Sequence, residues 1–162
     1  MPPFNKSAAE KKAETLFRSY KAALIKRFGR GPLSSEQLDE YGREAFGSMW
    51  GGWGDQRLNL KPDRYYVVNT SYAPKSRGIH WVAVVTSRAG IVHLFDSFAR
   101  NGSQLMPKLA AGIRKKGGSG GHFTEADRSD AEQRDSSAVC GHNALSFLCV
   151  VRDLGVRAAL KI

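Results

Sequence analysis

Four residues of this chain supply the groups that acyl transfer by a cysteine requires. Cys140 offers a thiol nucleophile, His80 an imidazole base and Asp96 a carboxylate that can orient the base. Gln133, seven residues before the cysteine, offers an amide donor for the oxyanion of a tetrahedral intermediate. These residue types together predict a cysteine peptidase.

Cys140 stands where a buried helix is expected to begin. The run from Ala144 to Val151 is apolar almost throughout, which predicts a central helix from about Cys140 to Leu154, closed by Gly155. A thiol at a helix N-terminus meets unpaired N–H groups and the positive end of the helix dipole, which lower its pKa. Gly141 leaves the approach to the sulfur unobstructed.

The second cysteine, Cys149, is predicted to be structural. It follows Cys140 by nine residues, and at about 100° per residue it points nearly the opposite way along the helix. A small buried hydrophobe is a common role for such a cysteine. The same divergence argues against a disulfide and against a zinc site of Cys140, His142 and Cys149. We therefore expect two free thiols and no metal.

A predicted β-hairpin brings His80 toward Asp96. Apolar, β-branched strands are expected over residues 79–86 and 91–96, joined by a four-residue turn that contains a glycine. A carboxylate at the end of the second strand can approach the imidazole and fix its tautomer. A histidine inside an apolar strand is otherwise more often a satisfied core residue.

Trp81 is expected to shield the His80–Asp96 pair from water, which strengthens their interaction.

His93 should lie on a strand surface, and Asp135 is either a rival carboxylate, a helix cap or plain loop. The weaker candidates for the base or the carboxylate are His93, His122, His142 and Asp135.

The remaining patterns complete an α+β chain. They comprise amphipathic helices over 7–28, 34–47 (with a capping box) and 103–116, a strand over 65–69, a glycine-rich turn over 48–54 and a polar loop over 124–137.

Gly51, Gly52 and Trp53, together with Trp81, are candidates for lining a substrate cleft. Glycines let a backbone approach closely, and the indoles can form a wall. The alternative is a loop pinned to the core by Trp50 or Trp53.

Composition predicts one domain over residues 1–162, with a basic N-terminal helix within 1–30 and a catalytic core over 47–155. No apolar stretch approaches the ~20 residues of a membrane span, and the N-terminus lacks the apolar core of a secretory signal. With only two cysteines, we expect a protein that is not secreted and folds in a reducing compartment. We also expect a monomer.

Basic residues exceed acidic residues by ten, 25 against 15. A surplus of this size is typical of contact with polyanions, or else of a solubilising surface. The candidates for contact with DNA lie on the polar side of the N-terminal helix, and they are Lys11, Lys12, Arg18 and Lys26.

The order His80, Asp96, Gln133, Cys140 resembles the adenovirus maturation protease family, adenain, within the clan that includes the SUMO-deconjugating proteases. The likeness runs from about Phe46 to Val151. The motifs that carry it are Asn69-Thr70, Gly78-Ile-His-Trp81, Leu94-Phe-Asp-Ser-Phe98, and Gln133 to Cys140-Gly141.

The resemblance implies a papain-like α+β fold in permuted order, with histidine before cysteine. It implies a central, mostly antiparallel sheet packed on a buried helix that starts at the catalytic cysteine. In the roles it carries over, His80 is the base, Asp96 its orienter, Gln133 the oxyanion donor and Cys140 the nucleophile.

It also implies a thiol protease of the virion and of the host nucleus or cytoplasm. Such a protease cleaves capsid and core precursors near glycine pairs, without metal or organic cofactor and with DNA as an activator.

The chain departs from adenain in three ways. Asp96 replaces a glutamate, no further cysteine is available for a disulfide-linked activating peptide, and the basic N-terminal helix has no obvious counterpart. Three alternatives remain open: a protease that removes ubiquitin-like modifiers, a same-fold acetyltransferase effector, and a basic DNA-binding capsid component without enzymatic activity.

Overall fold

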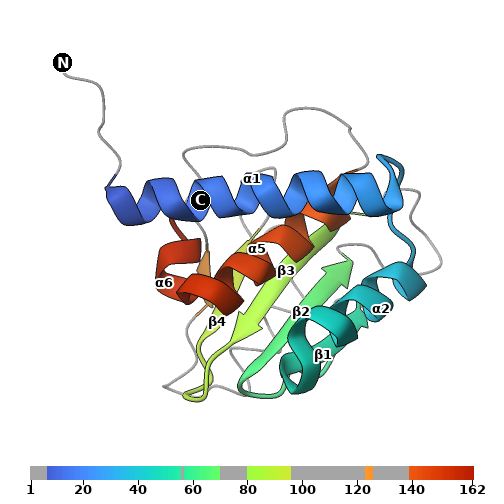
Figure 1. Ribbon diagram of the computed structural model, residues 1–162. Coiled ribbons are helices and arrows are strands. Elements are labelled where there is room, and N and C mark those ends of the chain that lie inside the picture. Colours follow the sequence, from blue (N-terminus) through green and yellow to red (C-terminus); the bar gives the residue numbers. More distant parts are fainter. Residues whose placement is uncertain (1–6, 56, 70–79, 96–122, 126–138) are drawn as a thin grey trace.

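Helix α5 lies between a β-sheet and a second long helix, α1 (Figure 1). This computed structural model describes residues 7–55, 57–69, 80–95, 123–125 and 139–162. Helix α1 spans Ala8–Phe28 and helix α5 spans Cys140–Leu154. Helix α2, Ser35–Phe46, packs beside α5 and the sheet edge, and the short α6, Val156–Ala159, follows α5.

The sheet has five strands in the order β1-β2-β3-β4-β5. The pairs β2–β3 and β3–β4 are antiparallel, and the outer pairs β1–β2 and β4–β5 are parallel. The described chain is therefore α+β with an antiparallel centre, as the sequence predicts. The strands are β1 Trp50–Gly54, β2 Arg64–Asn69, β3 Trp81–Thr86, β4 Val92–Phe95 and β5 Phe123–Glu125.

Strand β3 is buried along its whole length, because both faces of the sheet are covered there. Alternate side chains of the central strands fall into two buried clusters, one on each face. Val67, Ala83 and Val85 share one cluster with α5, whereas Val82 and Val84 belong to the other, against which Leu58 and Leu60 pack. Strand β3 is therefore a central strand covered on both sides.

Helix α5 is buried at every position from Cys140 to Val151, as its apolar sequence predicts. Phe147 stacks on Phe95 of β4 with ring centroids 4.6 Å apart. Phe17 of α1 meets the same Phe95 edge to face at 5.8 Å. One aromatic group thus joins the N-terminal helix, the central helix and the sheet.

The helix ends follow the local signals of the sequence. Ser7 caps α1 by accepting the N–H of Glu10, and Ser34 with Gln37 forms the predicted capping box of α2. Gly155 ends α5 with a φ of 89°, a value that favours glycine. No helix in the described part of the chain is long and apolar enough to cross a membrane.

Two expectations about loops are wrong. The segment predicted as a glycine-rich turn forms a short 3₁₀ helix, Gly47–Met49, and then β1, which pairs with β2. The predicted polar loop over 124–137 is wrong for its first two residues, which belong to β5 and pair with β4, and its remaining residues lie outside those that the structure describes. In both cases pairing with a neighbouring strand overrides weak local preference. The predicted helix over 103–116 lies outside the described residues.

Candidate active site

The sulfur of Cys140 lies at the first residue of α5, facing the start of β3. The side chain is almost buried, with 6% of the residue exposed. The backbone N–H of Trp81 donates a hydrogen bond to Sγ across 3.4 Å. His80, the residue immediately before β3, forms a side-chain hydrogen bond with the same thiol. The structure therefore brings together the predicted nucleophile and the predicted base.

Opposing effects act on the pKa of the Cys140 thiol. Burial raises this pKa, but the hydrogen bond from His80 and the backbone N–H groups of Trp81 and Gly141 lower it. The net pKa lies below the ordinary thiol value. The surroundings of Cys140 therefore favour the thiolate, the reactive form of a cysteine nucleophile.

Asp96 and Gln133 lie outside the described residues, so their predicted roles remain predictions. The hairpin that should present Asp96 is present, however. Its register pairs Phe95, the last residue of β4, with Ala83 of β3, three residues after His80. The strand that leads to Asp96 thus ends close to the strand that His80 precedes.

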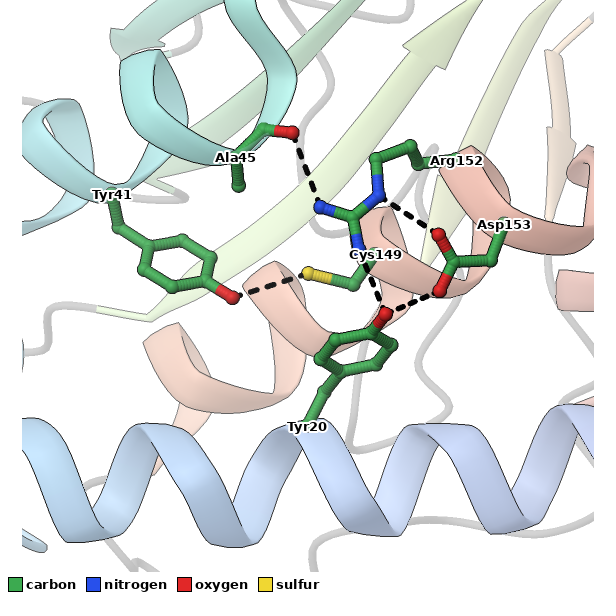
Figure 2. Close-up of polar contacts among 6 residues, drawn as sticks. All are labelled: Tyr20, Tyr41, Ala45, Cys149, Arg152 and Asp153. Atoms are coloured by element: carbon green, nitrogen blue, oxygen red, sulfur yellow. Dashed lines mark hydrogen bonds and ion pairs between the residues drawn. The ribbon is translucent and has the colours of Figure 1, made fainter.

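Cys149 has the environment of a structural thiol (Figure 2). It is fully buried, and its sulfur lies 3.4 Å from the hydroxyl of Tyr41. Burial raises the pKa of the Cys149 thiol, so it stays protonated at neutral pH. Both cysteines are free, as predicted. The same helix therefore carries one thiol whose pKa is lowered and one whose pKa is raised.

A polar network lies beside Cys149 and joins three helices (Figure 2). The Arg152 guanidinium donates to the Ala45 carbonyl of α2 at 3.1 Å and to the Tyr20 hydroxyl of α1 at 2.7 Å. It also pairs with Asp153, which accepts a hydrogen bond from the Tyr20 hydroxyl. This network connects the C-terminal end of α5 to α1 and α2. The N-terminal end of α5, where Cys140 lies, is held by other contacts.

The other described histidines do not join the Cys140–His80 pair. His93 lies on β4 and is half-buried, whereas the sequence predicts a surface position, and burial lowers its pKa. His142 is fully buried, and its Nε2 lies 2.7 Å from the carbonyl oxygen of Gly29. Among the described residues, no cluster of three potential metal ligands occurs.

Two tryptophans meet next to the thiol. Trp53 of β1 contacts Trp81 of β3 edge to face, with ring centroids 6.3 Å apart. Trp53 is 45% exposed, whereas Trp81 is buried. Trp81 therefore contacts both the candidate nucleophile, through its backbone N–H, and the exposed Trp53, through its ring.

Packing at Gly51 and backbone conformation at Gly52 explain why glycine occupies the two positions before Trp53. A Cβ at Gly51 would lie 2.3 Å from the Tyr66 ring, and Gly52 has a φ of +111°. The close approach that the sequence indicated at Gly51 is thus to the protein's own core. Trp50, whose Nε1 donates to Asp39 at 2.9 Å, pins this strand to α2.

The proposed DNA-binding side chains Lys11, Lys12, Arg18 and Lys26 are all exposed on α1. Arg27, by contrast, is engaged with Glu40 and Glu44 of α2. Exposure makes the four side chains available to a polyanion, and contact with DNA remains a prediction.

Two contacts of the candidate site and its surroundings could not be recognised from residue types. The donor to the Cys140 sulfur is a backbone N–H, which every residue except proline carries. The contact of His142 with Gly29 joins residues 113 positions apart. Their only sequence signals are the proximity of Trp81 to the predicted base and of His142 to the predicted nucleophile.

An α+β protein with a thiol–imidazole pair at the start of its central helix is the class that the fold and the site define. No protein-family model and no curated protein matches the chain. Among solved structures it is similar to the crystal structure of the selenomethionine ASFV pS273R protease, with a TM-score of 0.49 and 18% sequence identity. The match covers 82% of this chain and 62% of that one, less than two-thirds of its length. A likeness of this degree does not identify an activity, so function has to be argued from the site.

Proposed function

We propose that this protein is a cysteine endopeptidase in which Cys140 is the nucleophile and His80 the general acid and base. The observation that carries the proposal is the thiol of Cys140 at the start of a buried helix, hydrogen-bonded to His80 and to the Trp81 N–H, with a lowered pKa. A thiol intended only for packing, such as Cys149, has a raised pKa instead.

In the proposed mechanism the Cys140 thiolate attacks the scissile carbonyl carbon, and the C=O electron pair moves onto oxygen. The imidazolium of His80 then protonates the leaving amine as the C–N bond breaks, which leaves a thioester. His80 next removes a proton from water, whose oxygen attacks the thioester. Collapse of the second tetrahedral intermediate releases the carboxylic acid and restores the thiolate and the imidazolium.

The charged intermediate needs donors near the helix start. The backbone N–H of Cys140 belongs to the first turn of α5, where N–H groups lack helical partners. We assign it to the oxyanion together with the side-chain amide of Gln133. Asp96 is assigned to hold His80 in the correct tautomer, with Trp81 covering the pair.

The substrate proposed is an extended polypeptide that passes the exposed indole of Trp53. Of the two indoles only Trp53 is exposed, so a substrate would contact Trp53, while the buried Trp81 supports it from behind. Cleavage near glycine pairs is proposed from the sequence resemblance. By sequence resemblance, we propose that the natural substrates are viral capsid and core precursors and that the enzyme acts in virion maturation.

DNA is proposed as an activator because exposed basic side chains follow the outer side of α1. Added DNA should raise peptidase activity, and the gain should fade with salt because counterion release drives such binding. Replacing Lys11, Lys12, Arg18 and Lys26 together by glutamine should remove the gain and leave basal cleavage unchanged. Equal stimulation of this variant and the wild type would contradict the assignment.

A thiol-reactive peptide tests the catalytic assignment directly. A peptide ending in Gly-Gly and carrying a C-terminal electrophile should label Cys140 in the wild type, and much more slowly in His80→Gln. Mass spectrometry of the labelled peptide identifies the cysteine. Labelling of Cys149 in place of Cys140, or no labelling at all, would refute the proposal.

A further inference from the structure

Helix α5 begins without a side-chain cap. Its N-cap residue is Val139, whose apolar side chain cannot accept a hydrogen bond from the first turn. The first turn carries Cys140 and Gly141, whose N–H contributes to lowering the pKa of the thiol. A turn of this kind frays unless contacts from elsewhere in the fold hold it.

His142 makes such a contact on the side of the helix away from β3. Its ring is fully buried, and Nε2 lies 2.7 Å from the carbonyl oxygen of Gly29. A carbonyl oxygen only accepts, so Nε2 carries the proton and donates. Gly29 is the C-cap of α1, and the bond therefore ties the end of one helix to the start of another.

The segment that follows Gly29 also packs on the first turn of α5. Leu33 is buried, and a Cβ at Gly141 would lie 3.2 Å from the Leu33 side chain. The connection between α1 and α2 thus contacts both residues that follow Cys140. On the opposite side the turn meets β3 through the Trp81 N–H and the Cys140 sulfur. The first turn is held from two sides.

We infer that His142 is a positioning residue for the nucleophile: by holding the Gly29 carbonyl it seats the first turn of α5 so that the Cys140 sulfur stays on the Trp81 N–H and on His80. The inference rests on the proposed function in taking Cys140 as the nucleophile. His142 itself does not touch the reacting atoms.

The neutral form of the imidazole suits this role. Nδ1 is buried and has no hydrogen-bond partner among the described residues, so a second proton there would lack an acceptor. Burial lowers the pKa of His142, and the nearby charge of Lys21 in α1 lowers it further, against the effect of the Gly29 carbonyl. The ring therefore remains a single donor at neutral pH.

The test measures the rate of Cys140 alkylation by iodoacetamide against pH in the full chain, read by mass spectrometry of the Cys140 peptide. His142→Leu removes the donor. His142→Gln keeps an amide N–H at a similar reach. Tyr41→Phe is the matched control, because it removes the hydroxyl next to Cys149 at the other end of the same helix.

We expect His142→Leu to raise the apparent thiol pKa and to slow alkylation at neutral pH about tenfold, which corresponds to one pKa unit. His142→Gln should keep most of the wild-type alkylation rate. Tyr41→Phe should lower the melting temperature without changing the dependence of the alkylation rate on pH. If His142→Leu does not fold, His142→Asn replaces it. Its amide is too short to reach the Gly29 carbonyl, and the same shift is expected.

The outcomes separate the two ideas. A wild-type Cys140 that titrates like an ordinary thiol contradicts the proposed function. A lowered wild-type value that His142→Leu or His142→Asn leaves unchanged overturns the role of His142 alone. A shift in the apparent pKa of Cys140 that is equally large in Tyr41→Phe also overturns the role of His142. The shift would then result from a general loss of stability.

Discussion

The backbone N–H of Trp81 donates a hydrogen bond to the sulfur of Cys140 across 3.4 Å, although the two residues are 59 positions apart in the chain. This N–H belongs to the peptide bond between His80 and Trp81. The candidate base and the backbone donor to the sulfur are therefore adjacent in the chain. Any shift of β3 relative to α5 would change both interactions at once. The geometry of the site therefore depends on how the sheet packs on its central helix.

Removing the imidazole should lower both thiol reactivity and peptidase activity. We expect His80→Gln to reduce kcat/KM by about 10²- to 10⁴-fold, the usual contribution of a positioned acid and base. The thiol pKa should rise as well, because the hydrogen bond to Cys140 is among the effects that lower it. His93→Gln is the control: this half-buried histidine lies on β4, and its loss should leave activity intact. Equal losses in both variants would argue against His80 as the base.

The exposed tryptophan should matter for substrate and little for stability. Trp53→Ala loses an edge-to-face contact with Trp81, worth about 1 kcal/mol of unfolding free energy. We expect KM for a Gly-Gly peptide to rise several-fold with a smaller change in kcat, and Trp53→Phe to retain most of the affinity. An unchanged KM in Trp53→Ala, measured under the same conditions, would place the substrate elsewhere.

Two glycines should resist replacement because aromatic rings occupy the space of a Cβ. A Cβ at Gly42 would lie 2.3 Å from the Trp50 ring, which Asp39 holds in place, and a Cβ at Gly51 would lie 2.3 Å from the ring of Tyr66. Overpacking of this kind costs about 1–3 kcal/mol. Urea denaturation of Gly42→Ala and Gly51→Ala should show that loss. Gly31→Ala, with open space around the new methyl group, should change the unfolding free energy by about 0.5 kcal/mol or less.

Stability should fall in mildly acidic solution. The pKa values of His142 and His93 are lowered in the folded state, chiefly by burial. The unfolded chain therefore takes up protons below about pH 6.5, while the folded chain does not do so until lower pH. The contribution of the two neutral histidines to the unfolding free energy is therefore complete above about pH 6.5. It is lost as the pH falls toward their pKa values in the folded state. Carboxylates with lowered pKa, such as Asp39, act in a separate window below about pH 4.

Denaturation at pH 7.5 and 5.5 measures this effect. The unfolding free energy should be smaller at pH 5.5 than at pH 7.5. This difference should shrink in His142→Gln, because glutamine at position 142 cannot take up a proton. A difference of the same size in wild type and variant would show that other groups cause it.

The main elements could be predicted because local patterns and the final packing agree. The apolar run after Cys140 gives α5, and the signals at Ser34 and Gly155 give two of the helix ends where the structure has them. The hairpin of β3 and β4 follows from two β-branched runs around one turn.

The edges of the sheet could not be predicted in the same way. Strand β1 consists of two tryptophans and three glycines, which have no strand pattern, and it forms because it pairs with β2. Strand β5 is three residues long and depends on β4. In the site, residue types indicated Cys140 and His80, but the donation from Trp81 and the bond of His142 to Gly29 depend on tertiary packing, which residue types do not encode.

Cleavage of a peptide library by the wild type and by Cys140→Ala, compared under identical conditions, tests the central claim most directly. The account predicts cleavage by the wild type, concentrated next to glycine, and none by the variant, while Cys149→Ala retains the activity in proportion to its folded fraction. Cleavage by Cys140→Ala at the wild-type rate would contradict it.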